Sequence, residues 1–363
     1  MSDSKKQLNK LYAMNAIGNG CLAGAAWVAV LASAGYSATE IGICETIFHA
    51  VSLAAEIPSG VAADVFGRKK MMVLSGISAL IAGLMKAFSM GNFLWVAISM
   101  IFSALSYNLA SGSDAALAYE SLKHDGLEDL YDRYSANGSI IYRVFTGIAT
   151  LLAGVTVTLG MRRAELLDVA FMVVQIGIAL TLVEARSNTV RDINAWAAIK
   201  NCYIESFKFL KNHSRIFLML IVNSLIGAVD ILLIFFLQEE LSEAGVSLRL
   251  LGPGLFLVSL GGVVGSMISK KLNKTGIRKL AVICALGVTA CFVTGLTELP
   301  VLMVIGGFLS SMFDDMIQIK TDVKLNSVVP SEQRSTLISV SSFLFSCVMI
   351  VMSPVVGVIF SVF

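Results

Sequence analysis

The sequence predicts an all-α membrane protein, on three observations. Hydrophobic residues make up 56% of the 363 residues, and only 14% are charged, whereas an ordinary soluble domain carries about 25% charge. The mean hydropathy is +0.80. Apolar runs recur along the whole chain, and a run of roughly 20 residues is long enough to cross a bilayer core of about 30 Å as a helix. A collagen-like, disordered or disulfide-stapled chain is therefore excluded.

Eleven apolar runs are predicted to be transmembrane helices. The first run follows Lys5, Lys6 and Lys10, as a secretory signal would, but it is too long for one and ten more runs follow. We therefore expect it to remain as an uncleaved helix. Glycines and serines of the eighth and eleventh runs are expected to serve helix packing. The predicted helices cover 12–34, 40–63, 71–90, 92–117, 138–160, 165–184, 214–237, 250–269, 279–296, 300–319 and 336–360.

Lysine and arginine predict the orientation, because cytoplasmic loops of membrane proteins are enriched in them. If the N-terminus is cytoplasmic, 23 of the 27 basic residues fall on the inner side and only Arg162, Arg163 and Arg249 on the outer side. The remaining one, Lys86, lies near the outer end of its helix, where it can snorkel. We expect a multi-pass protein of the cell membrane with a cytoplasmic N-terminus.

The longest inner segment divides the predicted helices into six and five. It covers residues 185–213, and its apolar side chains recur at helical spacing, which predicts an amphipathic helix on the inner leaflet. We therefore expect an N-terminal six-helix bundle over 1–184, a central loop over 185–213 and a C-terminal five-helix bundle over 214–363. The apolar positions of the loop are Trp196, Ile199, Tyr203, Phe207 and Leu210.

The sequence contains no pattern that is typical of an enzyme or of a metal site. None of the six cysteines forms a C-x-x-C pair, and only three histidines are present. No H-E-x-x-H, G-x-S-x-G or Walker loop occurs. The 27 basic and 25 acidic residues give a net charge of +2, which does not favour nucleic acid as a partner. We expect no enzymatic activity, no cofactor and no metal.

One charged loop stands out between the second and third predicted helices. A glycine there permits a tight turn, and a carboxylate beside a helix N-terminus is stabilised by its exposed amides. The loop reads Gly60-Val-Ala-Ala-Asp64-Val-Phe-Gly67-Arg68-Lys69-Lys70. It resembles the signature G-x-x-x-D-x-x-G-R-K/R-K/R of the major facilitator superfamily, with the same spacing and at the same helix boundary.

This resemblance implies a fold of two pseudo-symmetric helical bundles around a central cavity, here with 6+5 spans. It implies alternating access, with the loop acting as a conformational lock on the inner side. If the lock contacts of the family are carried over to this chain, Asp64 faces the start of the last predicted helix near Ser331, and Arg68 pairs with Asp114. The alternative interpretation is that Arg68, Lys69 and Lys70 only enforce the orientation.

A second loop supports a duplication of the first half. It reads Asn273-Lys-Thr-Gly276-Ile-Arg278-Lys279, with the same three-residue step from Asn273 to Gly276 as from Asp64 to Gly67. The spacing between the two loops carries the helix at 165–184 beyond the end of the sequence. We therefore expect a family member that lacks the twelfth helix.

Ionisable residues inside the predicted helices are candidates for a proton path, because a charge in a bilayer costs about 2.5–3.5 kcal/mol on insertion scales. Glu45, His49, Ser52 and Glu56 lie on one face of their helix. Histidine titrates near neutrality, so this carboxylate–imidazole–carboxylate stripe can pass protons. The alternative is that Glu45 lies at the outer interface and Glu56 bonds a neighbouring helix.

Further candidates lie on other predicted helices. Arg143 is expected to pair with Asp114 or Glu120, as a clamp or as a substrate contact. Asp230 is the most isolated acid of the second half and is a proton or cation candidate. The remaining proton or substrate candidates are Tyr107, Asn223, Asp314 and Asp315.

These observations favour a monomeric secondary transporter of a small solute, coupled to protons and embedded in a lipid bilayer. Aromatic and methionine residues in the apolar runs favour the efflux of a drug-like compound. Uptake of a nutrient and a non-transporting or truncated membrane sensor are the alternatives.

Overall fold

The chain folds into helices in a computed structural model. The structure describes residues 3–184, 204, 208, 213–272, 276–328 and 334–362, and within these ranges it contains no strand. The predicted amphipathic helix of the segment 185–213 therefore lies outside the described residues, apart from three single positions. The prediction of an all-α protein is confirmed.

Contacts group the chain into two compact units. Unit 1 comprises residues 1–27 and 54–201, and unit 2 comprises residues 28–53 and 202–363. The segment 28–53, which the sequence places with the first six helices, thus groups with the later ones. The predicted domain boundaries at 184 and 214 remain predictions.

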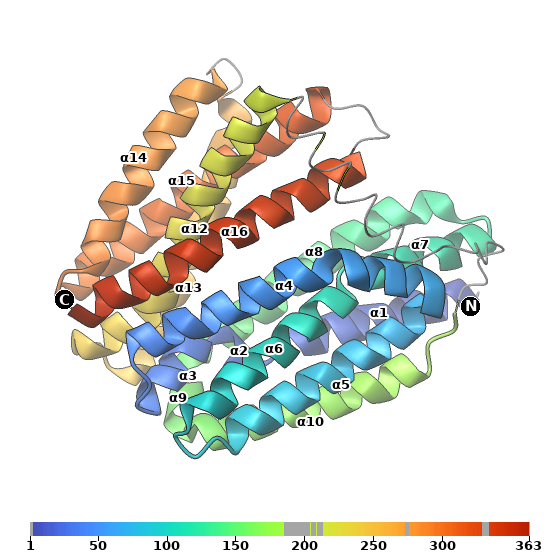
Figure 1. Cartoon of the computed structure of the whole chain (residues 1–363), viewed down its shortest axis with the longest axis horizontal. Coiled ribbons are helices and arrows are strands. Elements are labelled where there is room, and N and C mark those ends of the chain that lie inside the picture. The colour runs from blue at the N-terminus through green and yellow to red at the C-terminus, as the bar shows by residue number, and fades with distance from the viewer. Residues whose placement is uncertain are drawn as a thin grey trace. The chain divides into compact units, whose positions relative to one another are not determined.

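Unit 1 is organised around α5, which lies beside both α6 and α10 (Figure 1). Its inner core joins α1, α7, α8 and α10 through side chains such as Leu11, Leu122 and Tyr134. Tyr134 also stacks on Tyr12 with ring centroids 5.0 Å apart. The helices are α1 (Asp3–Asn19), α2 (Leu22–Ala25), the second part of α4 (Ala38–Phe66), α5 (Arg68–Ala87), α6 (Phe93–Ala110), α7 (Ser113–His124), η1 (Glu128–Leu130), α8 (Tyr131–Leu151), α9 (Ala153–Leu159) and α10 (Met161–Leu180).

The prediction of one continuous helix over 12–34 is wrong. The chain breaks after Asn19 and again at Ala26, which leaves the short α2 and α3 (Trp27–Ser33) beyond α1. A helix start leaves amides without partners, and here Asp168 of α10 accepts from the backbone nitrogens of Leu22 (2.7 Å) and Gly24 (3.1 Å). A distant carboxylate therefore stabilises the break, which no local pattern could reveal.

Two further predicted helices are also interrupted. The run 92–117 divides into α6 and α7 at Gly112, whose φ of +71° suits glycine. The run 138–160 divides into α8 and α9, which are bent by 53°.

Unit 2 contains most of the longest described helices. Cys284 and Val288 of α14 pack against Met316 and Ile317 of α15 in one hydrophobic core of this unit. The helices are α3, the first part of α4, α12 (Ser214–Glu243), α13 (Leu248–Lys271), α14 (Ile277–Gly295), α15 (Pro300–Val328) and α16 (Arg334–Val362).

Glycines let α13 approach the backbone of α15. A Cβ atom at Gly261 would collide with the carbonyl oxygen of Phe308, and one at Gly265 would collide with that of Met312. Small residues at such contacts bring helices close together, which is a common way for membrane helices to associate. The prediction that glycines in the run 250–269 serve packing is confirmed.

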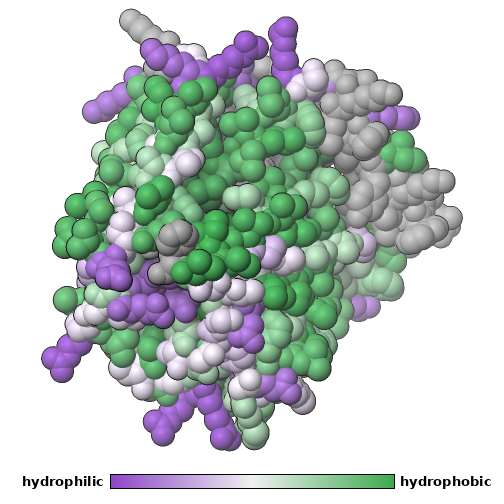
Figure 2. Space-filling model, turned by 60° about the vertical axis from the view of Figure 1, so that its left-hand side comes forward, coloured by the Kyte–Doolittle hydropathy of each residue, from purple (hydrophilic) through white to green (hydrophobic). Residues whose placement is uncertain are grey.

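Seven described helices are long and apolar enough to cross a membrane, and the bent pair α8 and α9 would make eight. Figure 2 shows hydrophobic residues over much of one face, with hydrophilic residues at its upper and lower margins. These features fit a multi-pass membrane protein. The exact count of eleven spans remains a prediction.

We predict that Gly261→Ala destabilises the protein and that Gly254→Ala does not. At Gly261 the added methyl group meets backbone, whereas at Gly254, on the same helix, its nearest neighbour is a Val304 methyl at 3.7 Å. Overpacking costs about 1–3 kcal/mol. Thermal unfolding in detergent should show a lower midpoint for Gly261→Ala alone. Equal midpoints for both variants would contradict the close approach.

Candidate functional site

The turn between α4 and α5 depends on Gly67. Its φ is +96°, and a Cβ atom there would lie only 2.7 Å from Oε2 of Glu184. The Glu184 carboxylate accepts from the backbone nitrogens of Arg68 (2.8 Å) and Lys69 (2.9 Å). It thereby satisfies the amides at the start of α5, where a negative charge is stabilised. Glu184 ends the last predicted helix of the first half, and the sequence analysis did not single it out.

Arg68 forms an ion pair with Glu120 instead of the predicted pair with Asp114. The Arg68 Nε atom lies 3.1 Å from Oε1 of Glu120. Asp114 lies in the first turn of α7, where its Oδ1 accepts from the nitrogen of Ala115 at 2.7 Å. The break at Gly112 starts a new helix at this point, so Asp114 stabilises that start and an acid farther along α7 meets Arg68.

For the other predicted lock residues, the structure gives a position but no contact, or no description of the side chain. Gly60 is exposed and lies inside α4, and Lys70 is exposed at the start of α5. The side chain of Asp64 and the residues around Ser331 lie outside what the structure describes. The predicted contact of Asp64 with the last helix therefore remains a prediction.

Arg143 and Tyr107 occupy exposed positions of unit 1. Within the described ranges Arg143 has no ion-pair partner, so its predicted pairing with Asp114 or Glu120 is not found. Tyr107 is 60% exposed, and its hydroxyl lies near Glu56 and Tyr142.

A buried ionic cluster in unit 1 escaped the sequence analysis. Lys86 Nζ lies 3.6 Å from Oε1 of Glu165, which is 4% exposed, so Lys86 pairs instead of snorkelling. Asp168, at 1% exposed, lies one turn farther along α10. The sequence does carry a signal for this cluster, because Glu165 and Asp168 lie three residues apart at the start of an apolar run. Because both accept fixed donors, they serve the structure of unit 1.

Asp230 is the most enclosed acid of unit 2. It is 4% exposed, and the hydroxyl groups of Ser310 and Ser311 lie beside its carboxylate. Its Oδ1 atom has no hydrogen-bond partner among the described residues. Asp315 of α15 interacts with it electrostatically. Asp230 thus differs from Asp168, whose two oxygens both accept backbone amides.

Asp314 and Asp315 approach two glycines on neighbouring helices. A Cβ atom at Gly227 of α12 would lie 3.4 Å from Oδ1 of Asp314, and one at Gly262 of α13 would collide with the Asp315 carboxylate. Asp314 also interacts electrostatically with Asp230. Three carboxylates from α12 and α15 therefore gather in one region of unit 2. The sequence analysis named each of them as a candidate but did not predict that they lie together. No group in the described part of the chain is arranged to hold a metal ion.

Two residues of the predicted stripe on α4, Glu45 and His49, contact each other, and Glu56 has other neighbours. His49 Nε2 lies 3.4 Å from Oε1 of Glu45, and both residues are 8% exposed. The His49 ring packs edge-on against Phe345 of α16, and its Nδ1 atom has no partner within the described residues. Glu56, farther along α4, lies near Tyr107 of unit 1.

The sequence profile of the Major Facilitator Superfamily matches residues 11–354. The chain belongs to this superfamily. It is therefore a multi-pass membrane transporter protein, and not an enzyme. The resemblance carried by the loop from Gly60 to Lys70 is confirmed.

Similar proteins support this assignment. The uncharacterized MFS-type transporter YxaM of Bacillus subtilis (strain 168) is 23% identical over 348 residues, which cover 93% of this chain and 84% of the relative. A mutant of the nucleoside transporter NupG has a similar structure with a TM-score of 0.76, at 15% identity, over 98% of this chain and 96% of that chain. A D-xylose-proton symporter is similar with a TM-score of 0.67, at 11% identity, over 96% of this chain and 87% of that chain. The last two likenesses show the fold.

We predict opposite effects for two glycine substitutions in the predicted lock. Gly67→Ala should destabilise the protein, because a residue with a Cβ atom is strained by about 1–3 kcal/mol at this φ of +96° and ψ of 147°, and Glu184 has to move. Gly60→Ala has open space and should be neutral or stabilising, by up to about 1 kcal/mol. Thermal unfolding of the two purified variants measures the difference. Similar midpoints would show that the Glu184 contact does not stabilise the turn.

Proposed function

We propose that the protein is a secondary active transporter that moves a small solute across the cell membrane by alternating access, driven by a proton gradient. The superfamily supports transport. The carboxylate cluster of unit 2 supports the coupling to protons, and it is the observation on which the proposal mainly rests. No catalytic step is required of the chain.

The physical argument for coupling concerns the cost of neighbouring charges. Two unit charges about 4 Å apart interact by about 4 kcal/mol at an effective dielectric constant of 20. Asp230, Asp314 and Asp315 interact with one another inside a membrane-spanning bundle. A proton bound within the cluster relieves this repulsion. When this proton is released on the other side of the membrane, the repulsion between the carboxylates returns and raises the energy of the helix bundle.

The loop after α4 supports the alternating-access part of the proposal. Arg68, tied to Glu120, and Glu184, at the start of α5, fix the loop on unit 1. This leaves Asp64, whose side chain is not described, as the group for a contact that forms in one state only. Such a contact shifts a balanced equilibrium five- to a hundredfold if it contributes about 1–3 kcal/mol.

We propose efflux of an amphiphilic compound as the direction of transport. Large aromatic side chains are exposed on unit 1 at Tyr107 of α6 and at Tyr142 and Phe145 of α8. Aromatic faces bind planar apolar compounds well. Uptake of a nutrient is the alternative, and the nucleoside and xylose transporters do not decide between them, because their similarity shows the fold.

We predict that Asp230→Asn abolishes most of the stimulation of transport by a pH gradient, because the amide cannot bind and release a proton. Reconstituted liposomes with either polarity of gradient measure the flux of ethidium, uridine and D-xylose as probes of the three cargo classes. Asp322→Asn is the matched control, since Asp322 is an exposed acid on α15.

The outcomes separate the alternatives. Unchanged gradient dependence in Asp230→Asn would move the coupling role to Glu45 and His49. Ethidium transport alone supports efflux, and uridine or xylose transport supports uptake. An absence of flux for every probe in the unmodified protein would favour the membrane sensor.

We also predict that the N-terminus is cytoplasmic, because the basic residues lie overwhelmingly on that side of the predicted topology. The variant Lys5→Cys, made in a chain without its other cysteines, places a thiol at an exposed position of α1, and it should react with a membrane-impermeant thiol reagent only after the membrane is permeabilised. Labelling of intact cells would reverse the proposed topology.

A further inference from the structure

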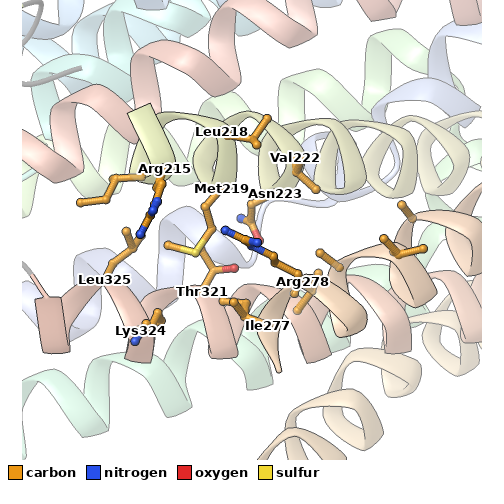
Figure 3. Close-up of a pocket in the computed structure, with 15 residues that line it drawn as sticks. Arg215, Leu218, Met219, Val222, Asn223, Ile277, Arg278, Thr321, Lys324 and Leu325 are labelled. Atoms are coloured by element: carbon orange, nitrogen blue, oxygen red, sulfur yellow. The ribbon is translucent and has the colours of Figure 1, made fainter. Parts of the chain in front are cut away.

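A pocket of about 710 Å³ lies within unit 2, between α12, α14 and α15. Figure 3 shows its lining side chains, with those of α12 on one side and those of α14 and α15 on the other. Most of the lining is aliphatic, as at Met219, Val222 and Ala285. The proposed proton cluster is separate, since none of its three carboxylates lines this pocket.

Two arginines line this largely apolar pocket. Arg215 of α12 and Arg278 of α14 turn their guanidinium groups toward the space between the helices (Figure 3). Within the described ranges, neither has an ion pair or a hydrogen bond. Lys324 of α15 adds a third positive charge to the lining. A group of cations in an apolar surrounding favours an anionic ligand.

Asn223 contributes an acceptor to the same pocket. Its Oδ1 atom is buried and has no hydrogen-bond partner among the described residues. A buried acceptor without a donor costs about 1–3 kcal/mol, so a ligand with a hydroxyl group would be stabilised there. This observation is independent of the arginines.

The pocket opens onto the apolar lateral surface of unit 2. Leu218 and Val282 line it and are 63% and 59% exposed. Of the seven membrane-crossing helices, α14 is the least buried, with 22% of its apolar window inside the protein. In a membrane protein, exposed aliphatic side chains of this kind contact lipid. A ligand of the pocket can therefore extend hydrocarbon across α12 and α14.

We propose that this pocket binds an anionic phospholipid with a hydroxyl-bearing headgroup, of the phosphatidylglycerol kind. The phosphate pairs with Arg215 and Arg278, a headgroup hydroxyl donates to Oδ1 of Asn223, and the acyl chains lie along Leu218 and Val282. Basic pockets between membrane helices are suited to acidic headgroups. A free anion would leave the apolar walls uncovered, and a purely apolar helix would leave both arginines unpaired.

Native mass spectrometry of the delipidated full-length protein in detergent tests the proposal, with phosphatidylglycerol and phosphatidylcholine of the same acyl chains as probes. We expect phosphatidylglycerol to bind about tenfold more tightly. Arg215→Gln and Arg278→Gln should each weaken it about tenfold, as loss of a charge-assisted contact predicts. Arg249→Gln, which removes an exposed arginine of α13 outside the pocket, should leave it unchanged.

Four results would overturn the proposal. They are equal binding of the two lipids to the unmodified protein, an equal loss in Arg249→Gln, displacement of the lipid by millimolar inorganic phosphate, and a dimer whose formation excludes the lipid. The lipid preference of the unmodified protein needs no variant. It therefore decides the question even if an arginine variant fails to fold.

Discussion

A carboxylate inside a hydrocarbon layer has to be given a donor, a cation or a proton, and this requirement organises the molecule. Asp168 takes two backbone amides, Glu165 takes Lys86, and Glu184 takes the amides at the start of α5. These acids are fixed by their partners and stabilise unit 1. Asp230 retains an oxygen that has no hydrogen-bond partner among the described residues, and in the proposed function it is the acid that exchanges a proton.

The distribution of these partners gives the two units different roles in the proposed mechanism. Unit 1 has its breaks at α2, α7 and α9. Hydrogen bonds to Asp168 hold the break before α2, and the Arg68–Glu120 ion pair and the Glu184 carboxylate hold the loop at Gly67. Unit 2 has longer helices, and glycines bring α13 against α15. A close glycine contact transmits small shifts directly, because no flexible side chain lies between the backbones. The Asp315 carboxylate of α15 lies against Gly262 of α13.

The sequence predicted the helical class, the superfamily and the Gly67 turn, because periodicity, charge bias and loop spacing are local signals. It could not predict the breaks in the run 12–34, which depend on Asp168, well over a hundred residues away. For the same reason it paired Arg68 with Asp114. The chain restarts a helix at Gly112, so Asp114 serves that start and Glu120 takes the arginine. The approach of Asp230 to Asp315 was equally invisible, since it depends on which faces of α12 and α15 meet.

The contact between Asp168 and α2 bears on how the chain enters the membrane during synthesis. Neither α1 nor α2 is among the helices that are long and apolar enough to span, and α10 is not among them either. The free amides of Leu22 and Gly24 gain their acceptor only when α10 has been made. If the helices entered the lipid one at a time, the amides of Leu22 and Gly24 would be without their acceptor until Asp168 arrived. The start of α2 is therefore completed only after the sixth predicted span has been synthesised, which makes the first and the last helices of unit 1 depend on one another for folding.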